Sequence, residues 1–73
     1  MNTVSDRIRA AALGPTPRDA KLSIGAWVGT GVEWNIVAGH LYDYSSPLQA
    51  WLMLGSDDNR RLFLLNVAEA MES

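Results

Sequence analysis

The side chains able to do chemistry are few in this 73-residue sequence, and the single histidine, His40, is the first of them. An imidazole can act as a general base, a pH-sensitive group or a metal ligand. Nucleophilic catalysis would also need a cysteine or serine held against it, but the chain has no cysteine, and the nearby Ser45 and Ser46 lie in no nucleophile-elbow pattern. We therefore expect His40 to be a polar loop or structural residue, and the protein to be no enzyme and to hold no metal.

Two adjacent carboxylates, Asp57 and Asp58, are the next candidates, as a paired-acid or cation site. Neighbouring residues at the start of a helix point in different directions, however, and acids are stabilised there by the helix dipole. The pair therefore predicts the first turn of a helix and a negatively charged surface.

A more unusual group is Asp43, which lies between Tyr42 and Tyr44 in the least regular part of the sequence. Loops carry function, and tyrosine is enriched in protein interfaces. These three residues are a candidate contact patch; the alternative is a solvated turn whose tyrosines lean back on the core.

No phosphate-binding loop accounts for the glycines, which are spaced unlike either nucleotide-binding fingerprint and are followed by no lysine that would neutralise phosphate. The glycines concerned are Gly25, Gly29, Gly31 and Gly39. We expect no cofactor.

The segment 22–38 contains three of these glycines, and its apolar residues are symmetric about the glycine-rich turn 29–31. Folded back at that turn, it would place four apolar pairs on one face: Val28 with Val32, Ala26 with Trp34, Ile24 with Ile36, and Leu22 with Ala38. This period-two alternation favours a β-hairpin over about 22–38. The alternative is two helices, because Thr30 to Glu33 fits a capping box and one helical face would carry Trp34, Val37, Ala38 and Leu41.

The rest of the chain is expected to be helical. A first helix begins at Thr3 or Ser5 and stops at Gly14, a second begins at Ser46-Pro47, and the last begins at Ser56. Leu48, Trp51 and Leu52 would form the apolar face of the second, and Phe63, Leu64, Val67, Ala68 and Met71 that of the last. The predicted fold is one small α+β domain over 1–73, with an N-terminal helix, a β-hairpin and two C-terminal helices; the alternative is a compact all-α bundle.

Three tryptophans are a high number for so short a chain. Trp34 and Trp51 lie on the predicted apolar faces, so we expect them in the core. Trp27 points to the other face of the hairpin, beside Glu33, and would be partly exposed if helices cover one face only; the alternative is that this second face is covered too, or that the chain dimerises through it. An exposed tryptophan is a common anchor in protein binding.

Charge is distributed unevenly about the net value of −2. Residues 1–21 carry four basic and two acidic groups, whereas residues 22–73 carry two basic and six acidic groups. An acidic body does not attract nucleic acid but does attract a basic protein surface. No secretory signal or membrane-length apolar run is present, and together with the absence of cysteine this predicts a cytoplasmic protein with no membrane partner.

These features predict a protein that binds a larger host protein or nucleoprotein complex and covers its basic surface. The acidic face would consist of Glu33, Asp43, Asp57 and Asp58. In size, acidity and absence of cysteine the chain is similar in general character to the small inhibitors that phages make against host defence, anti-CRISPR proteins included; the similarity involves no motif. The alternatives are a helix-turn-helix regulator that binds DNA through Arg7, Arg9, Arg18 and Lys21, and a homo-oligomer, such as a homodimer, assembled through Trp27 and the hairpin edge.

Overall fold

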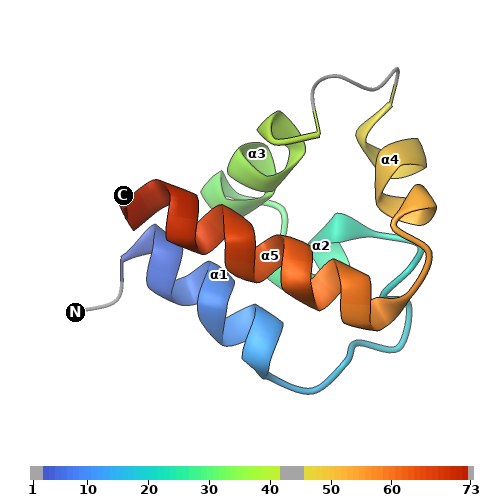
Figure 1. Ribbon diagram of the computed structural model, residues 1–73, viewed down its shortest axis with the longest axis horizontal. Coiled ribbons are helices and arrows are strands. Elements are labelled where there is room, and N and C mark those ends of the chain that lie inside the picture. Colours follow the sequence, from blue (N-terminus) through green and yellow to red (C-terminus); the bar gives the residue numbers. More distant parts are fainter. Residues whose placement is uncertain (1–2, 42–45, 73) are drawn as a thin grey trace.

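The computed structural model describes residues 3–41 and 46–72, and these residues form five helices and no strand. In chain order the helices are α1 (Val4–Leu13), α2 (Ile24–Val28), α3 (Val32–Gly39), α4 (Pro47–Met53) and α5 (Asp57–Glu72). Figure 1 shows α1 and α5 side by side and running in opposite directions, with α3 and α4 toward opposite ends of α5. The radius of gyration is 11.0 Å, equal to the value of about 11 Å typical of a compact domain of this length.

The predicted β-hairpin over 22–38 is wrong, and with it the α+β fold class. The segment forms two short helices, α2 and α3, joined at Gly29, as the all-α alternative proposed. The helical face named for that alternative is the one turned inward: Val37, Ala38 and Leu41 are buried and Trp34 is partly buried. Apolar residues in this segment recur both at the spacing of a helix and at every second position. The symmetry of its apolar pairs therefore did not discriminate between a hairpin and two helices.

The turn between α2 and α3 depends on two glycines. Gly29 has a φ of +79°, a backbone conformation that favours glycine. Gly25 lies inside α2, where an added Cβ would come within 3.3 Å of the Thr30 side chain and 3.8 Å of Trp34. Its missing side chain lets the start of α3 pack closely on α2.

Three helices begin at the polar residues that the sequence indicated. The hydroxyls of Thr3, Ser46 and Ser56 each accept a hydrogen bond from the backbone N–H three residues further on, at 3.2, 3.4 and 3.1 Å. Asp6 completes a capping box with Thr3, and Pro47 occupies the first turn of α4. These starts use only local contacts, which is why they could be predicted.

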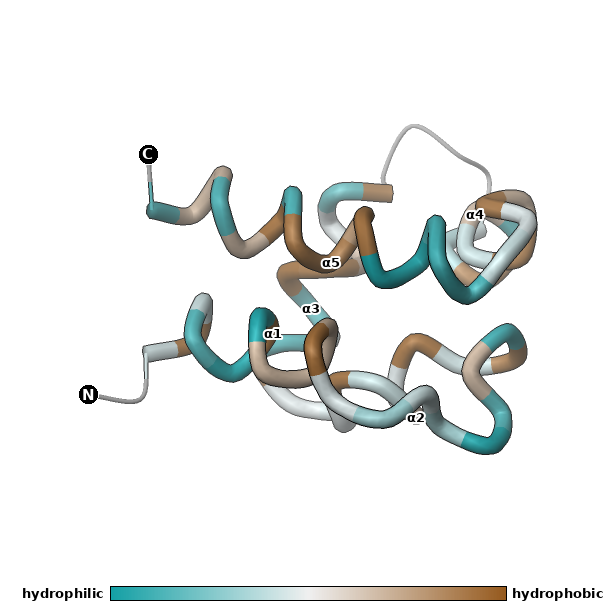
Figure 2. Tube along the Cα trace, turned by 60° about the horizontal axis from the view of Figure 1, so that its bottom comes forward, coloured by the Kyte–Doolittle hydropathy of each residue, from teal (hydrophilic) through white to brown (hydrophobic). Residues whose placement is uncertain are grey.

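The core is built around Trp51, whose side chain is fully buried. Its ring forms T-shaped pairs with Trp27, with centroids 6.5 Å apart, and with Phe63, at 6.3 Å. The buried apolar residues around it come from all five helices and the loops: Ile8, Ala12, Ala20, Ile24, Trp27, Val37, Leu41, Ala50, Leu64, Val67 and Ala68. Figure 2 shows the resulting mixture of apolar and polar residues along α5, whose predicted stripe is confirmed at Leu64, Val67 and Ala68, whereas Met71 is exposed.

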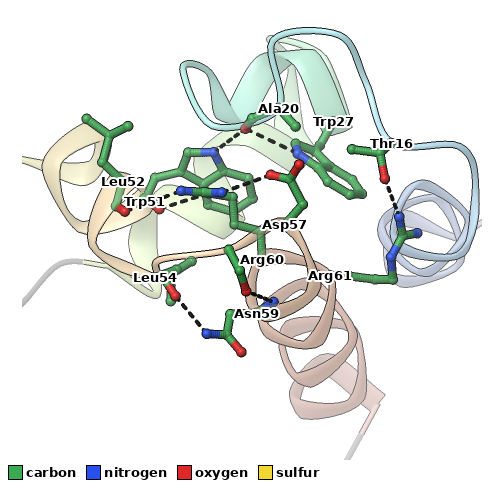
Figure 3. Close-up of polar contacts among 11 residues, drawn as sticks. Thr16, Ala20, Trp27, Trp51, Leu52, Leu54, Asp57, Asn59, Arg60 and Arg61 are labelled. Carbon is green, nitrogen blue, oxygen red and sulfur yellow. Dashed lines mark hydrogen bonds and ion pairs between the residues drawn. The ribbon is translucent and has the colours of Figure 1, made fainter.

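One backbone carbonyl, that of Ala20, accepts hydrogen bonds from two tryptophans (Figure 3). The indole Nε1–H of Trp51 donates to it over 2.7 Å and that of Trp27 over 3.3 Å. Ala20 belongs to the turn 17–22, which is itself closed by backbone hydrogen bonds to Pro17 and Asp19. The turn therefore supplies the acceptor that both buried indoles require.

We expect Trp51→Phe to lower the free energy of unfolding by about 2–3 kcal/mol, because it leaves a cavity and removes the shorter of the two indole hydrogen bonds. That is a large part of the ~3–5 kcal/mol available to a domain of this size. Trp34→Phe is the matched control: Trp34 is only partly buried, so its replacement should cost less than half as much. Urea denaturation followed by circular dichroism measures both, and equal losses would contradict the central role of Trp51.

Candidate functional site

Arg60, in the first turns of α5, is buried and bonded to the end of α4 (Figure 3). Its Nε–H donates to the carbonyl of Trp51 over 3.1 Å and its Nη2 to that of Leu52 over 3.2 Å. Its Nη1 bonds the Asp57 carboxylate at 2.9 Å, and the guanidinium lies 6.0 Å from the centre of the Trp51 ring. Carbonyls at the C-terminus of a helix carry partial negative charge, so this arginine caps α4.

Arg61 does the same for α1. Its Nη1 donates to the carbonyls of Ala12 and, over 2.8 Å, of Gly14, and its Nη2 donates to the Thr16 hydroxyl over 2.6 Å. The guanidinium also lies 5.1 Å from the centre of the Trp27 ring. Neither α1 nor α4 has a basic residue in its own last turn, and the two adjacent arginines of α5 supply both caps.

The two caps determine the charge of the surface. Arg60 and Arg61 are the only basic residues in 22–73, and both are committed to backbone carbonyls. Only 5% of the Arg60 side chain is exposed. Arg60 also forms an ion pair with Asp57, but neither capping role was predicted from the sequence. Only the order of helices in space reveals it, since Arg61 and Ala12 are 49 residues apart.

The first-turn acids of α5 lie where the sequence placed them. Asp57 is held by Arg60 with its side chain 46% exposed, and Asp58 is exposed beside it. Along the outer face of the same helix, Glu69 is exposed as well. The outward charge of α5 is therefore negative.

Glu33 is separated from these acids and does not belong to the same face. It forms an ion pair with Arg7, which joins α3 to α1, and only 14% of its side chain is exposed. The Arg7 guanidinium, through this bond, holds the pKa of the Glu33 carboxyl below its ordinary value. Glu33 is not part of a capping box either, because Gly31 precedes α3 and makes no side-chain hydrogen bond to it. The remaining members of the predicted site, Tyr42, Asp43 and Tyr44, lie outside the described residues.

The expected exposure of Trp27 is wrong. The side chain is 7% exposed, because the turn 17–22 accepts its indole N–H and Arg61 covers its ring. A side chain buried this deeply offers almost no area to a partner. Trp34, which we placed in the core, is the more exposed of the two.

A surface that the sequence did not indicate lies on α4. Leu48 and Leu52 were expected to pack inward with Trp51, but they are 46% and 37% exposed, and Met53 is 67% exposed. The core takes only Ala50 and Trp51 from this helix. The outward side of α4 is therefore mostly apolar, with Gln49 as its exposed polar residue, and α5 begins with acids only a few residues further on.

The lone histidine is assigned a local role. The Nδ1 of His40 lies 2.9 Å from the carbonyl of Ile36, within hydrogen-bonding distance, at the C-terminal end of α3, and the side chain is exposed. Within 3–41 and 46–72 no three histidine or acidic side chains are placed to hold a metal ion. Among the same residues, no helix has both the length and the apolar character needed to cross a membrane.

Comparison of the chain with protein-family models, with curated protein sequences and with solved structures finds no match. The functional argument therefore depends on the surface itself.

Replacing Arg60 tests its role as a buried cap. We expect Arg60→Met to cost about 2–3 kcal/mol of unfolding free energy, since α4 loses its cap and Asp57 its partner. Arg60→Lys should cost less, because it keeps the charge but cannot reproduce the planar fork. The exposed Arg18→Met should change stability by less than about 0.5 kcal/mol. If Arg60→Met and Arg18→Met denature at the same urea concentration, Arg60 does not cap α4.

The ion pair of Glu33 predicts how stability depends on pH. Because the pKa of Glu33 is lower in the folded chain than in the unfolded chain, the pair stabilises the fold at neutral pH. That contribution is lost as the pH falls from the ordinary pKa of a glutamate toward the lower pKa of Glu33 in the folded chain, where the carboxylate is protonated. Thermal unfolding between pH 7 and pH 2.5 should show a shallower acid-side decline for Glu33→Gln, and for Arg7→Gln. An unchanged decline in both variants would show that the pair is not formed.

Proposed function

We propose that this chain is a non-enzymatic, cytoplasmic protein-binding module that covers a basic surface of a larger host protein or nucleoprotein complex. The observation that carries the proposal is that Arg60 and Arg61 both bond backbone carbonyls of other helices, which leaves the exposed side of α5 acidic. An inhibitor of phage or mobile-element origin that acts against host defence would work in this way.

Electrostatics supports the choice of a basic partner. Asp58 and Glu69 are exposed on α5, and Asp57 and Glu72 are about half-exposed although each is paired with an arginine. Surfaces that hold nucleic acid are basic, because they must neutralise phosphates. A rigid acidic helix presented to such a surface accelerates encounter and competes with the nucleic acid for the same cations.

The predicted acidic face changes in composition under this proposal. Asp57 and Asp58 remain, and Glu69 joins them along α5. Glu33 leaves, since its carboxylate is engaged by Arg7 and mostly covered. Asp43 with its flanking tyrosines stays a prediction from the sequence.

DNA binding by a helix-turn-helix is the weaker alternative, although α2 and α3 are two helices joined by a short turn. In that motif the second helix enters the major groove and reads base edges with its outward side chains. On α3 the exposed positions are Val32, Asn35 and Gly39, and the only charge of the helix is that of Glu33. Such a helix would bring no cation to the phosphates.

The homo-oligomer alternative loses both of its supports in the part of the chain that the structure describes. It rested on an exposed Trp27 and on the edge of a hairpin, whereas Trp27 is buried and 22–38 is helical.

Charge reversal on α5 tests the proposal. Tagged wild-type protein incubated with bacterial lysate should retain a basic protein that salt releases, as identified by mass spectrometry. Asp58→Lys combined with Glu69→Lys should lose that protein while costing no more than about 1 kcal/mol of unfolding free energy, because both side chains are exposed and only Asp58 interacts with the dipole of α5. Asp19→Lys is the matched control: it reverses an exposed acid in the basic N-terminal part and should retain the partner.

Two results would contradict the proposed function. One is that the α5 double variant captures the same proteins as wild type. The other is that the purified wild-type chain binds duplex DNA with an affinity that falls steeply with added salt, as a phosphate-binding protein does.

A further inference from the structure

The short helix α4 exposes several large apolar side chains on the side away from the core. At 100° per residue, the buried Ala50 and Trp51 define one side, and Leu48, Leu52 and Met53 lie on the other together with one exposed polar residue, Gln49. Leu48 and Leu52 are four residues apart and therefore adjacent on the helix surface. Helices at the surface of a soluble domain usually turn polar residues outward, so this arrangement departs from the normal pattern.

The acidic start of α5 borders this apolar side. The Arg60 guanidinium bonds the Leu52 carbonyl through Nη2 and the Asp57 carboxylate through Nη1, so one planar group ties the two residues together. Figure 3 shows Leu52 and Asp57 on either side of that guanidinium. Asp58 follows directly and is exposed. The backbone at the end of α4 and the first carboxylate of α5 are thus held together, so the exposed apolar residues of α4 and the acids of α5 come from neighbouring segments.

A second copy of this chain is a poor occupant of that surface. The seven residues of α4 span only about 10 Å, and three side chains there cover far less than the ~800 Å² per partner typical of a stable dimer. A larger contact must extend onto Asp57 and Asp58. α4 has no charged residue and the neighbouring Arg60 is buried, so α4 and the start of α5 of a second copy would bring these acids no exposed cation.

The same acids make an anionic membrane a poor occupant of this surface. Negatively charged lipid surfaces attract lysine and arginine and repel carboxylates. A partner that satisfies both parts of the surface must offer apolar side chains in a row with basic side chains beside them.

We propose that Leu48, Leu52 and Met53 of α4, together with Asp57 and Asp58 of α5, form a docking surface for a basic amphipathic helix of the partner protein. This inference rests on the proposed function and gives the partner's contact a defined chemistry. The partner's apolar stripe covers α4, and its lysines or arginines meet the two carboxylates, as in other helix-in-groove contacts.

Three synthetic peptides of about 18 residues, each with a fluorescent label, test the inference against the full-length protein by anisotropy. The first has leucines at helical spacing and lysines between them. The second has the same composition with the leucines dispersed around the helix, and the third has glutamate in place of lysine. We expect the first peptide to bind about tenfold more tightly than the second, and the third not to bind.

Variants locate the binding. Leu52→Gln should weaken binding of the first peptide about tenfold, because Leu52 is at the centre of the proposed surface. Val32→Gln is the matched control: it removes an exposed apolar side chain from α3 and should change nothing. In NMR spectra, the amide shifts caused by the first peptide should cluster at 47–58.

The possible failures are distinguishable. If both lysine peptides bind equally and Leu52→Gln has no effect, charge alone attracts basic partners; the docking surface is then wrong and the proposed function stands. If neither lysine peptide binds better than the glutamate peptide, both proposals fail. If sedimentation shows a dimer of the free chain that Leu52→Gln dissociates, a second copy occupies the surface and the inference is overturned.

Discussion

The hydrogen bonding of two buried indoles to one carbonyl is the constraint on which this small fold depends. An indole N–H in an apolar interior requires an acceptor, and a carbonyl oxygen has two lone pairs. The turn 17–22 presents the Ala20 carbonyl to Trp27 of α2 and Trp51 of α4, which are 24 positions apart in the sequence. The shared acceptor fixes these two short helices relative to each other, although α2 and α4 are too short to be stable alone.

The two arginines of α5 follow from the same arrangement. Each lies near the ring of one of these tryptophans and each caps the C-terminal end of a helix, Arg60 that of α4 and Arg61 that of α1. Burial of Arg60 is tolerated because its donors meet two carbonyls and one carboxylate. Structural use of both cations leaves the outer face of α5 to the acids. The same two arginines therefore stabilise the fold and leave the proposed binding surface negatively charged.

The sequence predicts what local chemistry determines and fails where distant contacts decide. Helix starts at Thr3, Ser46 and Ser56 were predicted, because each hydroxyl caps a backbone N–H three residues away. The segment 22–38 was misassigned, since its apolar residues suit a hairpin and a pair of helices equally. The burial of Trp27 and the engagement of Glu33 by Arg7 depend on partners from other elements, which no spacing in the sequence specifies. Of the candidate site, the charge of the α5 start was predictable; the apolar outer side of α4 was not.

Hydrogen exchange of side-chain N–H groups, followed by NMR on the unmodified protein, tests the central claim most directly. The claim is that Trp27, Trp51 and Arg60 form a single buried hydrogen-bonded unit around the Ala20 turn. The indole N–H groups of Trp27 and Trp51 and the Nε–H of Arg60 should then exchange only with global unfolding, far more slowly than the indole of the partly buried Trp34. Equally fast exchange at all three tryptophans and at Arg60 would contradict the account.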